Sequence, residues 1–82
     1  MTYKLPDKIE IYAAALQSDI NSERLKQVVN GKLETYWIGT VYGGGVATDK
    51  GYKFSTPEDA WQNASDFVER CAEIVSERRS AP

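Results

Sequence analysis

The residue types that carry most enzyme chemistry are scarce in this chain. The sequence has no His and a single Cys. It therefore lacks imidazole bases, Ser-His and Cys-His nucleophile pairs, zinc sites that need His, and all-Cys metal sites. Carboxylates remain, and Glu34 and Asp49 lie near a glycine turn. We expect a non-enzymatic protein with no catalytic residue, no metal site and no cofactor.

Two further features could suggest chemistry. Gly43-Gly44-Gly45 precedes Lys50, as in some phosphate-binding loops, but the spacing fits neither glycine-rich phosphate motif and no helix follows directly. A hairpin turn is the favoured interpretation. Cys71 falls on the apolar stripe of a predicted helix, which indicates a buried thiol rather than a reactive one.

The clearest structural signal is the start of that helix. Thr56 suits the capping position, Pro57 suits the first helical position, and Glu58 and Asp59 suit the positive end of the helix dipole. Apolar residues then recur every three or four positions. The pattern predicts an amphipathic helix over residues 57–77.

The middle of the chain has the composition of strands and turns. Residues 34–42 are dense in β-branched and aromatic types and form the best predicted strand. A glycine turn at 43–45 leads to a short return strand at 46–48. A second turn at 49–51 leads to a third strand at 52–55.

Residues 7–29 have two interpretations. Apolar residues at helical spacing and the segment Ala13-Ala14-Ala15-Leu16 favour a helix that ends at Asn30-Gly31. In the alternative, a strand starts near Ile9 and Asn30-Gly31 is a tight hairpin turn. We favour the helix, which gives the order helix, three strands, helix.

The expected fold is a single α+β domain over residues 1–82, with a frayed tail at 78–82. A small three-stranded antiparallel sheet packs against the C-terminal amphipathic helix and is preceded by an N-terminal helix. A chain of this length has a thin core. The expected core residues are Trp37, Val41, Phe54, Ala64, Phe67, Cys71 and Ile74.

Both faces of the best predicted strand are apolar. Trp37 and Val41 point to one side. Tyr36, Ile38 and Tyr42 point to the other. The C-terminal helix can cover one face, so the other is covered by the N-terminal segment or is an exposed aromatic interaction surface. The residues expected to bind a partner are Tyr36, Ile38, Tyr42, Gly44, Lys50, Lys53, Glu58 and Asp59.

Charge and hydropathy argue against a nucleic-acid partner and against a membrane. The net charge is -2, the acidity is concentrated in the last helix, and no basic stripe typical of nucleic-acid binders is evident. No apolar run approaches the length that crosses a bilayer, so we expect no membrane association and a cytoplasmic location. A homodimer is compatible with the sequence.

The stretch "YWIGTVYGGG…GYKFSTPEDAWQNASDFV" resembles the three-strand-plus-helix arm-binding domain of phage and transposon integrases. The positions that carry the resemblance are Trp37, Gly43 to Gly45, Phe54, Thr56 and Ala60. It covers residues 36–68, less than half of the chain. The resemblance implies the scaffold, an origin in a phage or mobile element, and DNA binding through the sheet.

The helix, three strands, helix order also resembles the double-stranded-RNA-binding domain. That family has lysines at the start of its second helix, where this chain has Glu58 and Asp59. The small size and the surplus of aromatic residues on the sheet lead us to expect a small protein-binding module, an accessory protein that inhibits or adapts a larger host complex such as a defence or nucleic-acid-handling machine. The alternative is a nucleic-acid-binding domain that uses its sheet, with Lys32, Lys50 and Lys53 on phosphates.

Overall fold

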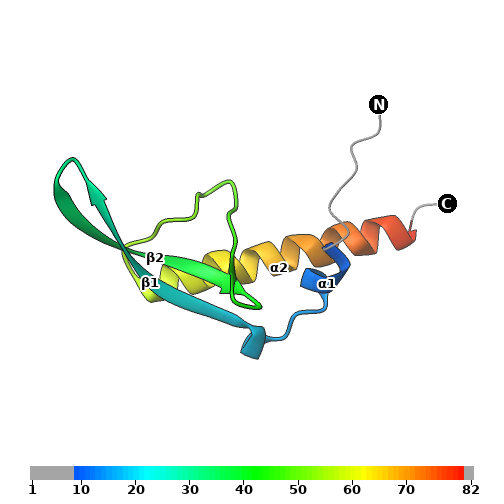
Figure 1. The fold of residues 1–82 in the computed structure, drawn as a ribbon. Coiled ribbons are helices and arrows are strands. Elements are labelled where there is room, and N and C mark those ends of the chain that lie inside the picture. Colours follow the sequence, from blue (N-terminus) through cyan, green and yellow to red (C-terminus); the bar gives the residue numbers. More distant parts are fainter. Residues whose placement is uncertain (1–8, 81–82) are drawn as a thin grey trace.

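The computed structural model describes residues 9–80, and Figure 1 shows their arrangement in two layers. The elements are α1 (Ile9–Ala13), the 3-10 helix η1 (Gln17–Asp19), β1 (Ile20–Val29), β2 (Lys32–Val41), β3 (Gly44–Gly45) and α2 (Pro57–Ser80). The strands form an antiparallel sheet in the order β1-β2-β3. The α+β class with a three-stranded sheet, a C-terminal helix and a preceding helix is confirmed.

The preference for a helix across residues 7–29 is wrong over β1. Asn30 and Gly31 both have positive φ, 53° and 78°, which is the backbone of a two-residue hairpin turn. This turn sets a ten-pair register that runs from Val29–Lys32 to Ile20–Val41. The tight Asn30-Gly31 turn of the alternative is therefore confirmed, but its strand start near Ile9 is wrong, because Ile9–Ala13 is helical. Within residues 9–29, helix is limited to α1 and the 3-10 helix η1.

The two strands predicted after β2, at 46–48 and 52–55, also differ from the structure. Tyr42 and Gly43 have positive φ and make the turn, so Gly44 and Gly45 pair with β2 instead of forming the turn themselves. The predicted strand at 52–55 is reduced to one bridge, in which Phe54 and Trp37 exchange both backbone hydrogen bonds at 2.8 and 2.9 Å. The segment between the Gly44–Gly45 pairing and the Phe54 bridge is a loop that extends away from the sheet.

The predicted start of the C-terminal helix is confirmed. The Asp59 N–H donates to Thr56 Oγ1 at 3.2 Å, so Thr56 satisfies one of the free donors of the first turn. Pro57 is the first helical residue, where its missing N–H costs nothing. The helix ends at Ser80, three residues beyond the expected end, so residues 78–80 of the expected frayed tail are helical. Residues 81–82 lie outside the described residues.

The core consists of two clusters along α2. One joins Ile20, Val41 and Val46 to Ala64 and Val68, and the other joins Ile9 to Cys71 and Val75. Of the expected core residues, Val41, Ala64 and Cys71 are buried. The others are partly buried: Phe67 and Ile74 border the clusters, and Trp37 and Phe54 lie outside them.

The molecule is long and thin. Its extents are 54 × 33 × 17 Å and its radius of gyration is 14.8 Å, against about 12 Å for a compact chain of this length. The β1–β2 hairpin projects past the N-terminal end of α2, and α2 itself is 24 residues long, so both lengthen the molecule (Figure 1). None of the helices within residues 9–80 combines the length and apolar character that a bilayer crossing requires.

Candidate protein-binding surface

The part of the hairpin from residue 24 to residue 37, here called the outer hairpin, extends beyond the helix layer. None of its residues is buried. The inner part of the hairpin is different, because α2 lies directly on Ile20, Gly39 and Val41. Figure 1 shows the outer hairpin as the twisted ribbon beyond the start of α2. The structure therefore exposes a hairpin of two ten-residue strands over most of its length.

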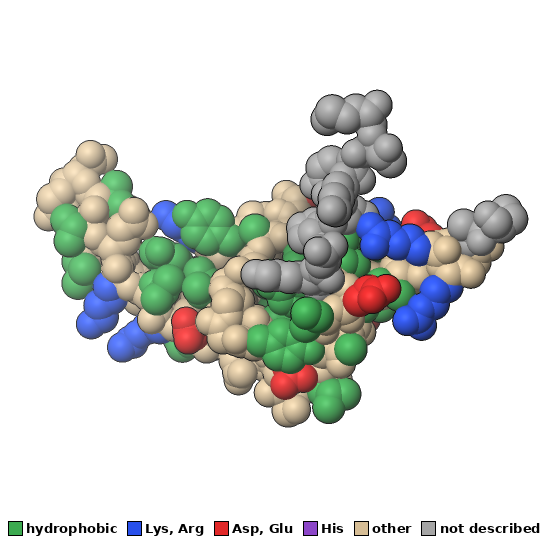
Figure 2. All heavy atoms as spheres, turned by 45° about the vertical axis from the view of Figure 1, so that its right-hand side comes forward, with side chains coloured by type: hydrophobic (Ala, Val, Ile, Leu, Met, Phe, Trp, Pro, Cys, Tyr) green, Lys and Arg blue, Asp and Glu red, His purple; other side chains and the backbone are tan. Residues whose placement is uncertain are grey.

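Apolar side chains are exposed on the outer hairpin. Val28 and Leu33 are a directly opposed cross-strand pair, and they are 69% and 64% exposed. Leu25 and Val29 on the other face of the sheet are half-buried. Figure 2 shows hydrophobic side chains gathered over this end of the molecule, with Lys and Arg side chains beside them. Apolar groups grouped in this way on a projecting element are typical of interaction sites.

The two sheet faces are in different environments. Opposed residues of an antiparallel pair share a face, so Arg24, Lys26 and Val28 lie on the face that α2 covers further in. Leu25 and Tyr36 lie on the opposite, open face. No described helix covers that open face, on which Tyr36 and Ile38 are half-buried.

Lys53 contacts three side chains at the open face. Its Nζ atom lies 4.8 Å from the centre of the Tyr36 ring and 5.6 Å from the centre of the Tyr52 ring. The same ammonium group donates a hydrogen bond of 3.0 Å to Gln27 Oε1 on β1. Cation–π contacts of this kind are worth about 0.5–1 kcal/mol at exposed sites. The contacts tie the 52–54 segment across β2 to β1, with Tyr36 half-buried and Tyr52 50% exposed.

The structure brings together only some of the residues predicted to bind a partner. Tyr36, Ile38 and Lys53 share the open face. Tyr42 lies at the other end of β2, where its ring stacks on Tyr12 at 6.2 Å and its hydroxyl donates to the Ile11 carbonyl at 2.9 Å. A side chain held by α1 in this way is not part of the same surface.

The remaining predicted residues lie in three other places. Gly44 pairs with Val41 at the inner end of the sheet. Lys50 is on the loop after β3 and forms an ion pair of 3.7 Å with Asp66 of α2. Glu58 and Asp59 are exposed on the first turn of α2. Glu58 lines a shallow hollow with Ser22 of β1, and Asp59 lines one with Lys50 on the other side of the helix.

Sequence reasoning missed the apolar and amide residues of this surface. Leu25, Val28 and Gln27 belong to the segment assigned to a helix, and Leu33 precedes the predicted strand. The spacing of Leu25 and Val28 fits a helix as well as opposite faces of a strand. The signal that could have found them is Asn30-Gly31, the strongest short hairpin sequence.

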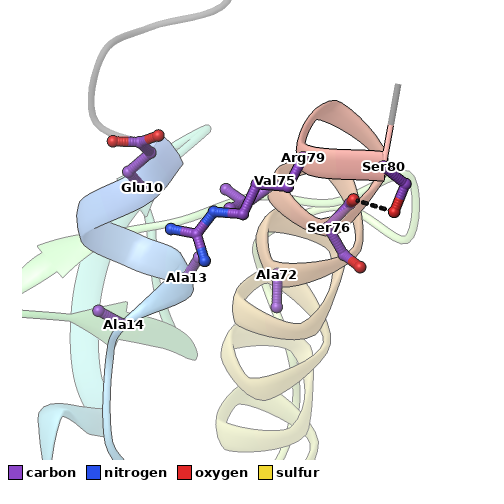
Figure 3. Close-up of a pocket in the computed structure, with 8 residues that line it drawn as sticks. All are labelled: Glu10, Ala13, Ala14, Ala72, Val75, Ser76, Arg79 and Ser80. Carbon is purple, nitrogen blue, oxygen red and sulfur yellow. Dashed lines mark hydrogen bonds between the residues drawn. The ribbon is translucent and has the colours of Figure 1, made fainter. Parts of the chain in front are cut away.

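A groove between α1 and α2 is lined mainly by alanines and serines, with Glu10 and Arg79 as its charged residues (Figure 3). The Ser80 hydroxyl donates to the Ser76 carbonyl at 2.9 Å within the helix. Residues 9–80 contain no cluster of three or more metal-ligating side chains. Burial raises the pKa of the Cys71 thiol above its ordinary value, which lowers its reactivity.

Comparison of the chain with protein-family models, curated proteins and solved structures finds no match. The assignment of a function therefore depends on the surface itself.

Proposed function

We propose that this protein is a non-enzymatic protein-binding module whose contact surface is the outer hairpin. The observation that carries the proposal is the exposed Val28–Leu33 pair on an element that projects from the core. A two-stranded ribbon gains little stability by itself in water. A hairpin of this length with solvent-exposed apolar side chains therefore gains most stability from a partner that covers those side chains.

The open face adds the second part of the surface. Tyr36 and Tyr52 present aromatic area around a cation, and Leu25 lies opposite Tyr36 on the neighbouring strand. Aromatic side chains are enriched at protein–protein interfaces because they bury a large area and lose little rotamer entropy. The chain thus has apolar anchors on both faces of one hairpin.

The expected partner is a larger protein or complex. The integrase resemblance favours an accessory protein of a phage or mobile element, and in this form of the proposal the hairpin inhibits or adapts a host complex. The sequence supports the non-enzymatic character, because it has no His and its single Cys is buried.

Affinity capture with matched variants tests the proposal. The tagged chain is used on a lysate of the organism that carries the gene, beside the variants Leu33→Asp and Leu16→Asp. Leu33 and Leu16 are equally exposed, at 64% and 67%, but Leu16 lies outside the hairpin. We expect a stoichiometric protein that Leu33→Asp loses and Leu16→Asp retains. Equal capture by all three proteins, or no stoichiometric partner, would contradict the proposal.

A second candidate function is nucleic-acid binding by the hairpin. The observation that favours it is that Arg24 and Lys26 are exposed on β1, where they add to Lys32 and Lys53. Arg24 and Lys26 lie on one sheet face and Lys32 and Lys53 on the other, so two phosphate contacts from one face would give a slope of about -2 in log K against log salt, and four contacts from both faces about -3 to -4. Titration of labelled duplex and single-stranded oligonucleotides at low salt tests it. Binding that Arg24→Ala weakens and Lys50→Ala leaves unchanged would support this function.

A further inference from the structure

We infer that the free edge of β1 is a docking edge for an extended segment of another protein with acidic residues at alternate positions. The inference deepens the proposed function and rests on it, because it names the partner's conformation and chemistry. Three observations support it. They are the direction of the β1 backbone N–H and C=O groups, the charges along the strand, and the pairing of two copies of this chain that those charges disfavour.

The outer edge of β1 has free backbone groups. Trp37 exchanges both of its backbone hydrogen bonds with Phe54, so the N–H and C=O of Trp37 point away from β1. Its partner on β1 is Arg24, whose backbone groups must then point away from β2. The pattern repeats every second residue. The residues whose N–H and C=O face outward are therefore Ser22, Arg24, Lys26 and Val28.

The inner end of this edge is closed by α2. The indole Nε1 of Trp61 donates to the Ile20 carbonyl at 3.1 Å, and Ile20 belongs to the same outward-facing set. Among residues 9–80, no hydrogen bond caps the outward-facing backbone groups of the four residues Ser22, Arg24, Lys26 and Val28. This leaves a stretch long enough for a partner strand to add to the sheet, the mode of recognition called β-augmentation.

A second copy of this chain is a poor occupant of the edge. In a symmetric antiparallel pair the outward-facing groups must meet, so one residue lies opposite its own copy. Pairing centred on Glu23, Arg24 or Lys26 puts each of these charges opposite itself. These registers, together with the one centred on Leu25, are those that pair most of β1.

Pairing of two copies of β1 centred on Leu25 is destabilised as well. In that register Arg24 lies opposite Lys26 of the second copy, and the contact occurs twice. Like charges directly opposed across strands are destabilising. The charges of β1 therefore oppose self-pairing in each long register, which is how natural edge strands avoid aggregation. They do not oppose a strand with complementary charges.

The charge pattern specifies the partner. Arg24 and Lys26 lie two residues apart on one face, so a strand that pairs with them needs acidic residues two positions apart. Apolar residues are required opposite Val28 and Leu25. At Ser22 the partner strand would lie close to two acidic side chains. Glu58 lines the same hollow as Ser22, and Glu23 is the next residue of β1, so basic residues fit at this end of the partner strand. An antiparallel partner would read Val-Thr-Glu-Val-Glu-Lys-Lys or similar.

The first test uses self-association of the full chain. Lys26→Glu converts the register centred on Leu25 from two repulsive contacts into two attractive ones. We expect this variant to dimerise at concentrations up to about 1 mM, where the unmodified chain stays monomeric in analytical ultracentrifugation. Lys32→Glu makes the same charge change on β2 and is expected to stay monomeric. A monomeric Lys26→Glu variant, or dimers of both, would overturn the inference.

The second test uses a synthetic peptide of the sequence Val-Thr-Glu-Val-Glu-Lys-Lys and its charge-reversed form Val-Thr-Lys-Val-Lys-Glu-Glu. Binding of the first should slow hydrogen exchange of the outward N–H groups of Arg24 and Lys26. The double variant with Arg24→Glu and Lys26→Glu should reverse the preference between the peptides by about tenfold. Equal binding of both peptides, or no protection of these two amides, would contradict the edge assignment.

Failure of this inference is distinguishable from failure of the proposed function. Leu33→Asp changes a sheet face and leaves the backbone edge of β1 intact. If Leu33→Asp loses the captured partner while the Arg24→Glu, Lys26→Glu double variant retains it, the protein-binding function stands and the edge inference is wrong.

Discussion

Gly39 of β2 lies directly under Ala64 of α2. A β-carbon built on Gly39 would be 2.8 Å from the β-carbon of Ala64, and closer still to the backbone carbonyl oxygen of Ala60. Both alanines are completely buried. The sheet and the helix therefore approach as closely as their backbones allow, and this contact sets how α2 lies across the hairpin.

Replacing Gly39 by Ala should destabilise the fold. The added methyl group meets backbone, which cannot move aside as a flexible side chain can, so α2 must shift. We expect a loss of about 1–3 kcal/mol in the free energy of unfolding, measured by urea denaturation. Gly44→Ala is the control, since its nearest neighbour is the Val41 carbonyl oxygen at an ordinary 3.7 Å. Equal effects of both would disprove the close approach.

The exposed apolar residues of the outer hairpin should contribute little to stability. Val28→Ala removes a side chain that is 69% exposed, so we expect a change within about 0.5 kcal/mol. Val41→Ala is the same substitution at a residue that is 1% exposed, and it should cost about 2 kcal/mol. A large loss for Val28→Ala in chemical denaturation would mean that the pair stabilises the fold.

Asn63 joins α2 to the loop that connects β3 to Phe54. It is 2% exposed, its Nδ2 donates to the Gly51 carbonyl at 3.1 Å, and its Oδ1 accepts from the Thr48 hydroxyl. Asn63→Ala leaves both loop groups without this partner and should cost about 1–3 kcal/mol. Limited proteolysis should then cut the loop at 47–52 faster. Exposed Gln62→Ala, one residue earlier, should change neither quantity.

The buried thiol of Cys71 should make stability depend on pH. Burial raises the pKa of Cys71 above its ordinary value of 9.0, so the folded state favours the neutral thiol. This contribution is fully present below pH 9 and is lost as the pH rises through the folded-state pKa, because the unfolded thiol ionises first. The free energy of unfolding should fall by at most about 1.4 kcal/mol per pH unit in that window.

The matched comparison for this prediction is Cys71→Ala. Other groups also titrate above pH 9, so the relevant quantity is the difference in slope between the two proteins. The folded thiol should also react slowly with iodoacetamide at pH 8 and rapidly in urea. Fast reaction of the folded protein, or identical slopes with and without the thiol, would show that Cys71 is accessible.

The signals read correctly from the sequence act between near neighbours in the chain. Thr56 and Pro57 start α2 because a cap and a first-turn proline need only the residues next to them. The alternation of Trp37 and Val41 with Tyr36 was also correct, because side chains of a strand alternate wherever the strand lies. These local rules determined the α+β class and much of one sheet face.

Only the tertiary structure decided the rest. Leu25, Val28 and Val29 have a spacing that suits a helix, and they are in a strand because the Asn30-Gly31 turn pairs them with β2. The exposure of the outer hairpin depends on where α2 begins relative to Gly39, a distance that no local pattern encodes. The proposed binding surface therefore arises from long-range pairing and helix placement, whereas the sequence by itself determined only the strand β2 and the helix α2.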